Sequence, residues 1–454
     1  MIMKGTYYMI PALLLVLPAI MYAQTADTTY WTLERCVEYA LKHNIELNAE
    51  KLTLKECDIS VSDGKMAFVP RISTSTYFNM SIGRVLDETT YDFVTSQSVG
   101  SSTASLSVNV PIFDGLRNVR QLQAAKIDKY TSELKVEKAS NDLILNITAC
   151  FLEVLCAREN ITNCESLVKS LHQQELHTER KVEAGKVTYV DLLQVRSRLA
   201  EAENALLMAV HSYDVLRLKI CQLLEIEDYA CFVPCADEYE NISCVTVNYM
   251  SIWYNACRLP QIRMAENALE LSRKNIQIAR SSYYPSLSFS VGYGSSYSTA
   301  RQDIIMSTNN KYTYKTYPFF DQYRDNANGY VSFGLSIPIL NGMTARNRVR
   351  KAKLDLKRSE YALASTYKQL RKDVLQAIMD AETAWGKYMG SVRYLESSKE
   401  VLRQIGLKYE AGAANMTEYT TAVSAMSEAQ CQYLSSKYEY IFREKVLLFY
   451  ENSH

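Results

Sequence analysis

The sequence predicts an α+β membrane protein with an internal duplication, in which short membrane strands alternate with long antiparallel helical hairpins. Two segments, 104–126 and 331–353, share one pattern at an offset of 227 residues: an alternating strand, a proline and the start of a helix. The strands have one apolar and one small polar face, and the helices that follow are too long for a compact domain. A pattern that recurs at a fixed offset indicates that one structural unit is present twice.

Identical residues mark the repeat in both its strands and its helices. Upstream of the first strand the offset falls to 215, because Pro70 corresponds to Pro285, so the loop between the strands should be about twelve residues longer in the second copy. The residues shared at the offset of 227 are Ser105, Pro111, Ile112, Gly115, Ala125, Lys126, Lys181, Glu183, Ala184, Gly185, Ser197, Glu201 and Ala202 in the first copy, and Ser332, Pro338, Ile339, Gly342, Ala352, Lys353, Lys408, Glu410, Ala411, Gly412, Ser424, Glu428 and Ala429 in the second.

The N-terminus has the pattern of an export signal. A single basic residue, Lys4, precedes an apolar run from residue 8 to residue 21, and Ala23 ends the segment, so we expect residues 1–23 to be a secretory signal peptide. The alternative is a membrane anchor, for which the apolar run is short. Residues 24–69 should form the N-terminal helical segment of the first repeat, because Pro70 ends the helical pattern.

Each copy should contribute one β-hairpin to a membrane. We assign residues 70–113 to the first hairpin, with an external loop at about 81–103, and residues 285–340 to the second, with a longer loop at about 295–329. The apolar residues that alternate with Ser, Gly or Asn are Leu106, Val108, Val110 and Ile112 in the first copy, and Leu287, Phe289, Val291, Tyr293, Val331, Phe333, Leu335, Ile337 and Ile339 in the second.

The number and length of these strands determine what they can form. About ten tilted residues cross a bilayer, so each strand can span one. Four strands cannot close a barrel, and an open sheet edge in lipid leaves backbone groups without hydrogen bonds. We therefore expect the chain to pool its strands with copies of itself. Tyr77, Phe78, Tyr283 and Tyr284 lie near strand ends, where aromatic residues favour a membrane interface.

The helices should form two hairpins, at residues 114–230 and 341–450, with turns at Gly185 and Gly412. Between residues 116 and 184 there is neither Gly nor Pro, and one continuous helix of this length would reach roughly 100 Å. Asp114 and Asn341 are expected to be the N-caps of the two outgoing helices. Residues 231–258 form a linker and residues 259–284 the incoming helix of the second copy.

The return arms of both hairpins have coiled-coil spacing. In the second copy the spaced residues are smaller and more polar, so that seam could face water or another subunit. The first seam comprises Leu192, Val195, Leu199, Ala202, Leu206, Ala209, Tyr213, Leu216 and Ile220, and the second comprises Tyr419, Ala422, Met426, Ala429, Tyr433, Ser436, Tyr440, Arg443 and Leu447.

Composition argues against several classes of function. The chain has 50 basic and 50 acidic residues and no formal net charge, so it lacks the basic footprint of a nucleic-acid binder. We find no catalytic signature and no pair of histidines at metal-ligand spacing, and we therefore expect no enzyme activity, cofactor or metal site. Of the eleven cysteines, Cys231, Cys235 and Cys244 cluster in the linker, where a disulfide is possible in an oxidising compartment.

The arrangement resembles the outer membrane efflux protein (TolC) family. The resemblance rests on residues 33–41 and 44–47, on the proline-flanked strands and on the two tip motifs at 183–185 and 410–412, and it covers nearly the whole mature chain. It implies a homotrimer with a twelve-stranded barrel in the Gram-negative outer membrane and a coiled-coil tunnel of helices in the periplasm. It also implies docking to a periplasmic adaptor that is fed by an inner-membrane pump of RND or ABC type.

Family knowledge can be transferred to the tips of the hairpins. The resemblance implies that Gly185 and Gly412, with the preceding Ala184 and Ala411, contact the adaptor. It places acidic residues near the tunnel constriction six positions after each glycine, which are Asp191 and Glu418 here. A further acid and a basic residue expected nearby are replaced by Thr421 and Ala414, so the lock between hairpins should differ in detail. A ring of carboxylates at the constriction would favour cations.

The function that these features predict is thus a passive outer membrane exit duct for efflux or type I secretion. Two alternatives belong to other classes. A periplasmic adaptor has a helical hairpin but lacks amphipathic membrane strands, and a coiled-coil surface scaffold has heptads but no reason to interrupt them with paired strands.

Overall fold

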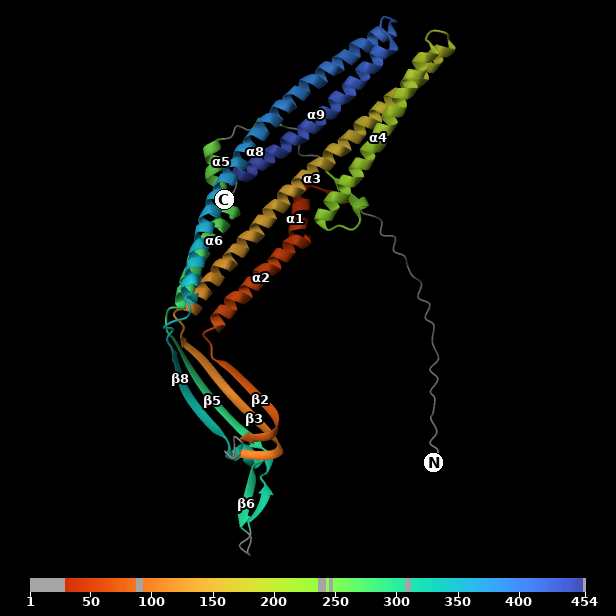
Figure 1. Cartoon of the computed structure of the whole chain (residues 1–454). Helices are drawn as coiled ribbons and strands as arrows, with labels where there is room; N and C mark the ends of the chain where they lie inside the picture. Colours follow the sequence, from red (N-terminus) through yellow and green to blue (C-terminus); the bar gives the residue numbers. More distant parts are fainter. Residues whose placement is uncertain (1–28, 87–92, 236–241, 245–247, 307–311, 452–454) are drawn as a thin grey trace, which may run out of the picture.

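The computed structural model describes residues 29–86, 93–235, 242–244, 248–306 and 312–451. Figure 1 shows an elongated molecule with a curved β-sheet at one end, two helical hairpins reaching to the other end, and shorter helices packed around the middle. This architecture confirms the predicted fold class. The proposed signal peptide, residues 1–23, lies outside the described residues.

The first described segment is more divided than the single helical stretch predicted for residues 24–69. Strand β1 (Thr29–Trp31) pairs in parallel with β4 (Phe232–Pro234), and two helices follow, α1 (Leu33–His43) and α2 (Ile45–Met66). The break lies at Asn44, whose side-chain oxygen accepts a hydrogen bond from the backbone N–H of Leu47 at 3.0 Å. Asn is a strong N-cap, and this bond ends one helix and starts the next.

Four strands form the membrane sheet, in the order β2 (Arg71–Leu86), β3 (Phe93–Phe113), β5 (Ser286–Ser298) and β8 (Asn328–Ser336). Neighbours are antiparallel. The loop predicted at 81–103 is wrong, because β2 and β3 continue to pair well into that range. In β3 the apolar alternation stops at Ala104, whereas backbone pairing needs no apolar side chains and continues through Ser102, Gly100 and Ser98.

The register places the apolar residues of all four strands on one face. Ile72 pairs with Val108, Val108 with Val291 and Val291 with Val331, so one row of branched aliphatic side chains crosses the whole sheet. The opposite face is joined by hydroxyl pairs, with Ser73 Oγ 2.8 Å from Ser107 Oγ. One apolar and one polar face is the pattern of a barrel wall between lipid and water.

The loop predicted at 295–329 is also wrong in detail, because it contains ordered elements. Strand β5 runs to Ser298, a separate hairpin follows from β6 (Gln302–Met306) and β7 (Tyr312–Thr316), and a short helix α7 (Phe319–Asp325) leads back to β8. These elements contain the extra length of the second copy. Polar and apolar residues do not alternate regularly in these elements, so a search for strands with one lipid-facing apolar side does not find them.

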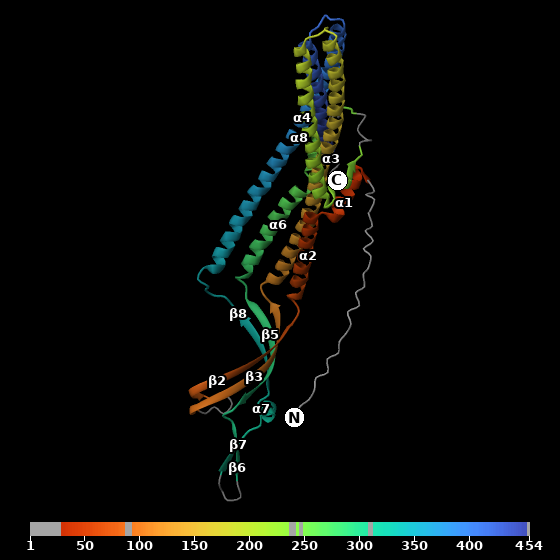
Figure 2. The same ribbon diagram turned by 90° about the vertical axis from the view of Figure 1, so that its right-hand side faces the viewer.

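The two hairpins have equal dimensions. The outgoing helices α3 (Arg117–Glu183) and α8 (Thr344–Glu410) each have 67 residues, and the return helices α4 (Tyr189–Leu224) and α9 (Met416–Glu451) each have 36. At 1.5 Å per residue each outgoing helix is about 100 Å long. Figure 2 shows both hairpins ending at the same height.

The strand-to-helix junctions are also duplicated, and they correct the predicted N-caps. The residues before the two helices are Leu116 and Met343, both left-handed, with φ of 64° and 65°, and neither makes a side-chain cap bond. Asp114 still helps the first helix, because its Oδ2 accepts from the N–H of Asn118 at 2.9 Å. Asn341 acts through its backbone carbonyl, which accepts from Thr344.

Two apolar cores lie near mid-height, one for each hairpin. The first packs α1 and β4 against the middle of α3 and the end of α4, around Phe151 and Phe232. The second packs α5 (Tyr249–Ala256) and α6 (Pro260–Ser281) against α8 and α9, around Ile252 and Leu370. A short 3-10 turn (Tyr229–Cys231) precedes β4, and Cys231 and Cys244 are free thiols among the described residues.

Both predicted seams are buried or half-buried along their length. The second seam, which could have faced water or another subunit, packs within the chain against α8, where Ser436 Oγ lies 2.6 Å from Ser391 Oγ. Among the described helices, α3 alone has a window long and apolar enough to cross a membrane, and 44% of that window is buried in the chain. Buried side chains of α3 such as Phe151 and Leu155 belong to the first apolar core.

Candidate functional site

The hairpin tips are two copies of one turn. At the first tip the N–H of Gly185 bonds to the carbonyl of Val182 and that of Lys186 to Lys181; at the second, Gly412 bonds to Tyr409 and Ala413 to Lys408. Both glycines are left-handed, with φ of 69° and 73°. This Schellman motif needs a residue without Cβ strain, which explains glycine at both positions.

The tips present backbone and small side chains to the surroundings. Ala184, Gly185, Ala411 and Gly412 are all exposed. No described atom lies within 4 Å of the position that a Cβ would occupy on either glycine. The glycines are therefore required by backbone conformation and not by packing, which leaves their surface free for a partner.

Asp191 has a local structural role at the first tip. Its Oδ2 accepts hydrogen bonds from the N–H of Thr188 at 3.0 Å and from the Thr188 hydroxyl at 2.7 Å, while the Thr188 hydroxyl accepts from the N–H of Asp191. This is a reciprocal capping box, and it fixes the start of α4. The negative charge also lies at the positive end of the helix dipole.

Glu418 occupies the equivalent position at the second tip. Its N–H donates to Asn415 Oδ1 at 2.8 Å, and the Asn415 amide donates to Glu418 Oε1 at 3.3 Å. The Glu418 side chain is exposed, whereas Asp191 is half-exposed. Both predicted constriction acids thus lie at the same level, each oriented by the cap of a return helix.

A cation–π contact joins the two hairpins near the tips, beside an aromatic stack between α8 and α9 of the second hairpin. The rings of Tyr409 and Tyr419 stack with centroids 5.3 Å apart, and Lys181 Nζ from the first hairpin lies 5.0 Å from the centre of the Tyr409 ring. Burial raises the pKa of Tyr409, and the Asp191 carboxylate raises it further. Lys181 and Tyr409 form a cation–π contact, which holds the hairpins together in a solvent-accessible region.

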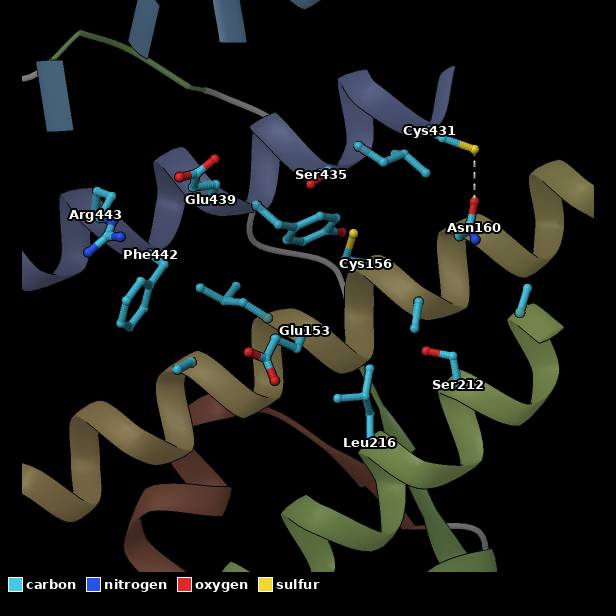
Figure 3. Close-up of a pocket in the computed structure, with 16 residues that line it drawn as sticks. Glu153, Cys156, Asn160, Ser212, Leu216, Cys431, Ser435, Glu439, Phe442 and Arg443 are labelled. Carbon is cyan, nitrogen blue, oxygen red and sulfur yellow. Dashed lines mark hydrogen bonds between the residues drawn. The ribbon is translucent and has the colours of Figure 1, made fainter. Parts of the chain in front are cut away.

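A groove of about 800 Å³ lies between α3, α4 and α9. Figure 3 shows Cys431 of α9 directed at Asn160 of α3, where the thiol donates to Asn160 Oδ1 at 3.2 Å. Burial raises the pKa of Cys156 in this groove to about 11, so its sulfur is a neutral thiol at neutral pH. Among the described residues no cluster of three or more His, Cys, Asp or Glu side chains is arranged to hold a metal ion.

Sequence reasoning missed an exposed apolar stripe on α2. Ile45, Leu52, Ile59 and Met66 are spaced by seven and are between 57% and 66% exposed. Seven-residue spacing of apolar side chains is the signature of a coiled-coil seam. The spacing was visible in the sequence, but only the structure shows that the seam lacks a partner among the described residues.

Together, an open four-stranded membrane sheet and two helical hairpins about 100 Å long define a TolC-like outer membrane channel. The sequence profile described as outer membrane efflux protein matches residues 36–224 and 256–447. This chain belongs to the outer membrane efflux protein family, and its place is the outer membrane, with the hairpins in the periplasm. The comparisons give no support to the adaptor or surface-scaffold alternatives.

Individual relatives are distant but cover most of the chain. The alkaline protease secretion protein AprF of Pseudomonas aeruginosa is 21% identical over 85% of this chain and 77% of its own length. The pyoverdine export outer membrane protein OpmQ of Pseudomonas putida is 22% identical over 72% of this chain and 65% of its own. The Campylobacter jejuni CmeC outer membrane channel has a TM-score of 0.78 at 15% identity, covering 93% and 85%.

Proposed function

We propose that three copies of this chain form a passive exit duct, which docks through its hairpin tips onto a periplasmic adaptor fed by an inner-membrane pump of RND or ABC type. The observation that carries the proposal is that both the sheet and the row of helices joined to it have two outer elements without a neighbour on one side in the described chain. The outer strands of the sheet are β2 and β8. The helices joined to the strands pack side by side in the order α2, α3, α6 and α8. The two outer strands, β2 and β8, are thus joined to the two outer helices, α2 and α8, which we call the end helices.

Barrel geometry supports a trimer. Four strands leave two edges without hydrogen-bond partners, which lipid does not tolerate. Two copies would give eight strands, and a barrel of that size is filled by its own side chains or holds one small ligand. Three copies give twelve strands, the smallest of these numbers that leaves room for a conduit.

The end helices are complementary in charge as well as in shape. On α2 the exposed stripe is flanked by the exposed acids Glu56 and Asp63 and the exposed bases Lys55 and Lys65, and the helix as a whole has five acidic and three basic residues. On α8 the exposed side chains Leu354 and Tyr361 are accompanied by a strongly basic run, namely Arg346, Arg348, Arg350, Lys351, Lys353, Lys357 and Arg358. Opposite charges beside an apolar seam favour pairing of α8 in one copy with α2 in the next.

The duct itself would be passive. The chain offers no catalytic constellation that we recognise, so we expect no enzyme activity and no requirement for a cofactor or metal, with energy supplied by the pump. Relatives are named for different cargo, alkaline protease in one and pyoverdine in another. Cargo selection therefore belongs to the adaptor and pump in this proposal.

Docking at the tips can be tested by photocrosslinking in living cells. A benzophenone amino acid at Ala413, which is exposed beside Gly412, should capture a periplasmic adaptor that mass spectrometry can identify. The matched control is the same probe at Phe320, which is exposed at the opposite end of the molecule. Capture of the same protein from both positions, or of none from Ala413, would contradict tip docking.

The constriction can be tested separately by single-channel recording. Glu418→Gln removes the charge but keeps a side-chain oxygen that can accept from Asn415, so the cap should survive. If Glu418 lines a carboxylate ring, the variant should lose most of its preference for cations over anions. An unchanged reversal potential in a salt gradient would confine Glu418 to its capping role.

A further inference from the structure

The external end of the sheet has an aromatic group that channel formation does not require. It consists of Tyr297 at the end of β5 and Phe319, Phe320 and Tyr323 on α7, and we call it the rim cluster. Phe319 links the group, because its ring centroid lies 4.8 Å from that of Tyr297, 5.4 Å from Phe320 and 4.7 Å from Tyr323. Figure 2 shows α7 beside the outer end of β5.

Helix α7 is held rigidly by the edge of β5. Strand β8 pairs with β5 only as far as Gly294, so the β5 edge is open beyond that point. The fully buried Gln322 replaces the missing strand: its Oε1 accepts from the N–H of Ser298 and its Nε2 donates to the Ser298 carbonyl, both at 3.0 Å. The Asn326 amide donates to the carbonyl of Ser296 at 2.7 Å.

The register shows on which side of the sheet the rim cluster lies. Tyr323 Oη is 2.6 Å from Ser102 Oγ, and Ser102 pairs with Tyr297. Side chains two residues apart on a strand share a face. Ser102 is therefore on the face of Leu106 and Val108, and Tyr297 is on the face of Val291 and Tyr293, so the rim cluster continues the apolar face and does not enter the lumen.

The height of the rim cluster matches the edge of the bilayer. From Leu287, the first apolar residue of β5, to Tyr297 the strand advances ten residues, or about 33 Å at 3.3 Å per residue. A strand tilted by about 40° rises about 25 Å over that length, which is the height of the apolar band of an outer membrane barrel. Tyr297 and α7 therefore lie at the external interface.

We propose that the rim cluster is an interfacial anchor that seats α7 in the outer leaflet of the membrane. Phe320 is the residue that would insert, because it is 83% exposed even though its ring touches that of Phe319. Aromatic rings are favoured at the boundary between hydrocarbon and headgroups. The proposal rests on the membrane location of the sheet and is independent of which cargo passes through it.

The test uses lipid-borne and aqueous quenchers. The chain has three tryptophans, Trp31 in β1, Trp253 in α5 and Trp385 in α8, all outside the membrane sheet, so their emission gives a constant background. Phe320→Trp is purified as the full-length protein and reconstituted in vesicles of phosphatidylcholine brominated along the acyl chain. We expect the brominated lipid to quench most of the fluorescence that the new tryptophan adds, and aqueous iodide to quench little of it.

Adjacent residues of β2 provide matched controls. Phe78 pairs with Ser102 and lies on the apolar face, whereas Tyr77 lies on the opposite face. Phe78→Trp should therefore be quenched by lipid and Tyr77→Trp by iodide. If Phe320→Trp follows Tyr77→Trp, α7 projects into water and the proposal is wrong. If neither quencher reaches it, the ring is covered by another protein surface, which also overturns the proposal. Circular dichroism verifies that each variant is folded.

Discussion

Glycine has opposite effects on stability at two positions of the second hairpin. Gly412 has φ of 73°, a conformation that costs an L-residue about 1 kcal/mol, whereas Gly386 lies in the interior of α8, where an added Cβ would meet no described atom within 4 Å. We therefore predict that Gly412→Ala destabilises the protein by about 1 kcal/mol and that Gly386→Ala stabilises it by a similar amount. Thermal melting followed by circular dichroism in detergent compares them, and shifts of equal sign would contradict this account.

Buried thiols predict a pH dependence. Burial, with a smaller contribution from Cys221, raises the pKa of Cys36 from 9.0 to about 12. Because the folded pKa is the higher one, the stability contributed by the protonated thiol is fully present below pH 9.0 and is lost as the pH rises toward 12. Near pH 9 iodoacetamide should modify the exposed Cys244 rapidly and Cys36 hardly at all, as peptide mapping can show. Equal rates would mean that Cys36 is accessible.

At the residue scale, the sequence identified positions with one strong local requirement. Gly185 and Gly412 were predictable because a helix that ends in a left-handed turn needs glycine. The N-caps at Asp114 and Asn341 were not, because the chain inserts two left-handed residues before each helix, and a leucine or methionine in that conformation has no sequence signal. Spacing places Asp191 and Glu418 at equivalent positions of the two tips, but spacing does not separate capping, which the structure shows, from pore lining, which stays a prediction.

At the element scale, a single side chain completes the edge of β5. Gln322→Leu keeps the volume but removes the two hydrogen bonds that Gln322 makes to the N–H and carbonyl of Ser298, at about 1–3 kcal/mol for each bond. We predict that α7 then detaches and that trypsin added to whole cells cleaves at Arg324 or Arg301 much faster than in the parent protein. The control is Phe320→Leu, an exposed and still apolar change on the same helix that leaves the bonds of Gln322 in place, so cleavage should be unchanged.

Helices were easier to predict than loops for a physical reason. A stretch without Gly or Pro over 67 residues has few alternatives to a helix, and coiled-coil spacing fixes which side is buried. The segment between β5 and β8 is held by hydrogen bonds between residues far apart in the sequence, such as those of Gln322, and no local sequence pattern predicts them. The strand ends were underestimated because alternation reports contact with lipid, while hydrogen bonding continues in water.

On the scale of the whole molecule, the order of the helices repeats the order of the strands. Each membrane strand directly precedes or follows one helix in the chain. The strand order β2, β3, β5, β8 therefore matches the helix order α2, α3, α6, α8. If the sheet twists or closes into a barrel, the helices joined to its strands must therefore twist or close in the same way. The sequence predicted the strands and the helices joined to them, but their order and the identity of the end helices became known only from the pairing of strands and the contacts between helices.

Closure between copies can be tested with one residue at the centre of the α2 stripe. In the proposed trimer Ile59, 61% exposed in the single chain, is buried against the basic part of α8 in the next copy, which would contribute about 1.5–3 kcal/mol at each of three interfaces. Ile59→Arg adds like charge to that contact and should abolish the trimer measured by light scattering in detergent. Ile59→Glu loses the same apolar area but meets opposite charge, so it should retain a larger trimer fraction, and salt should reduce the difference between the two variants because it screens exposed charges. A full trimer in Ile59→Arg would show that α2 faces something other than α8.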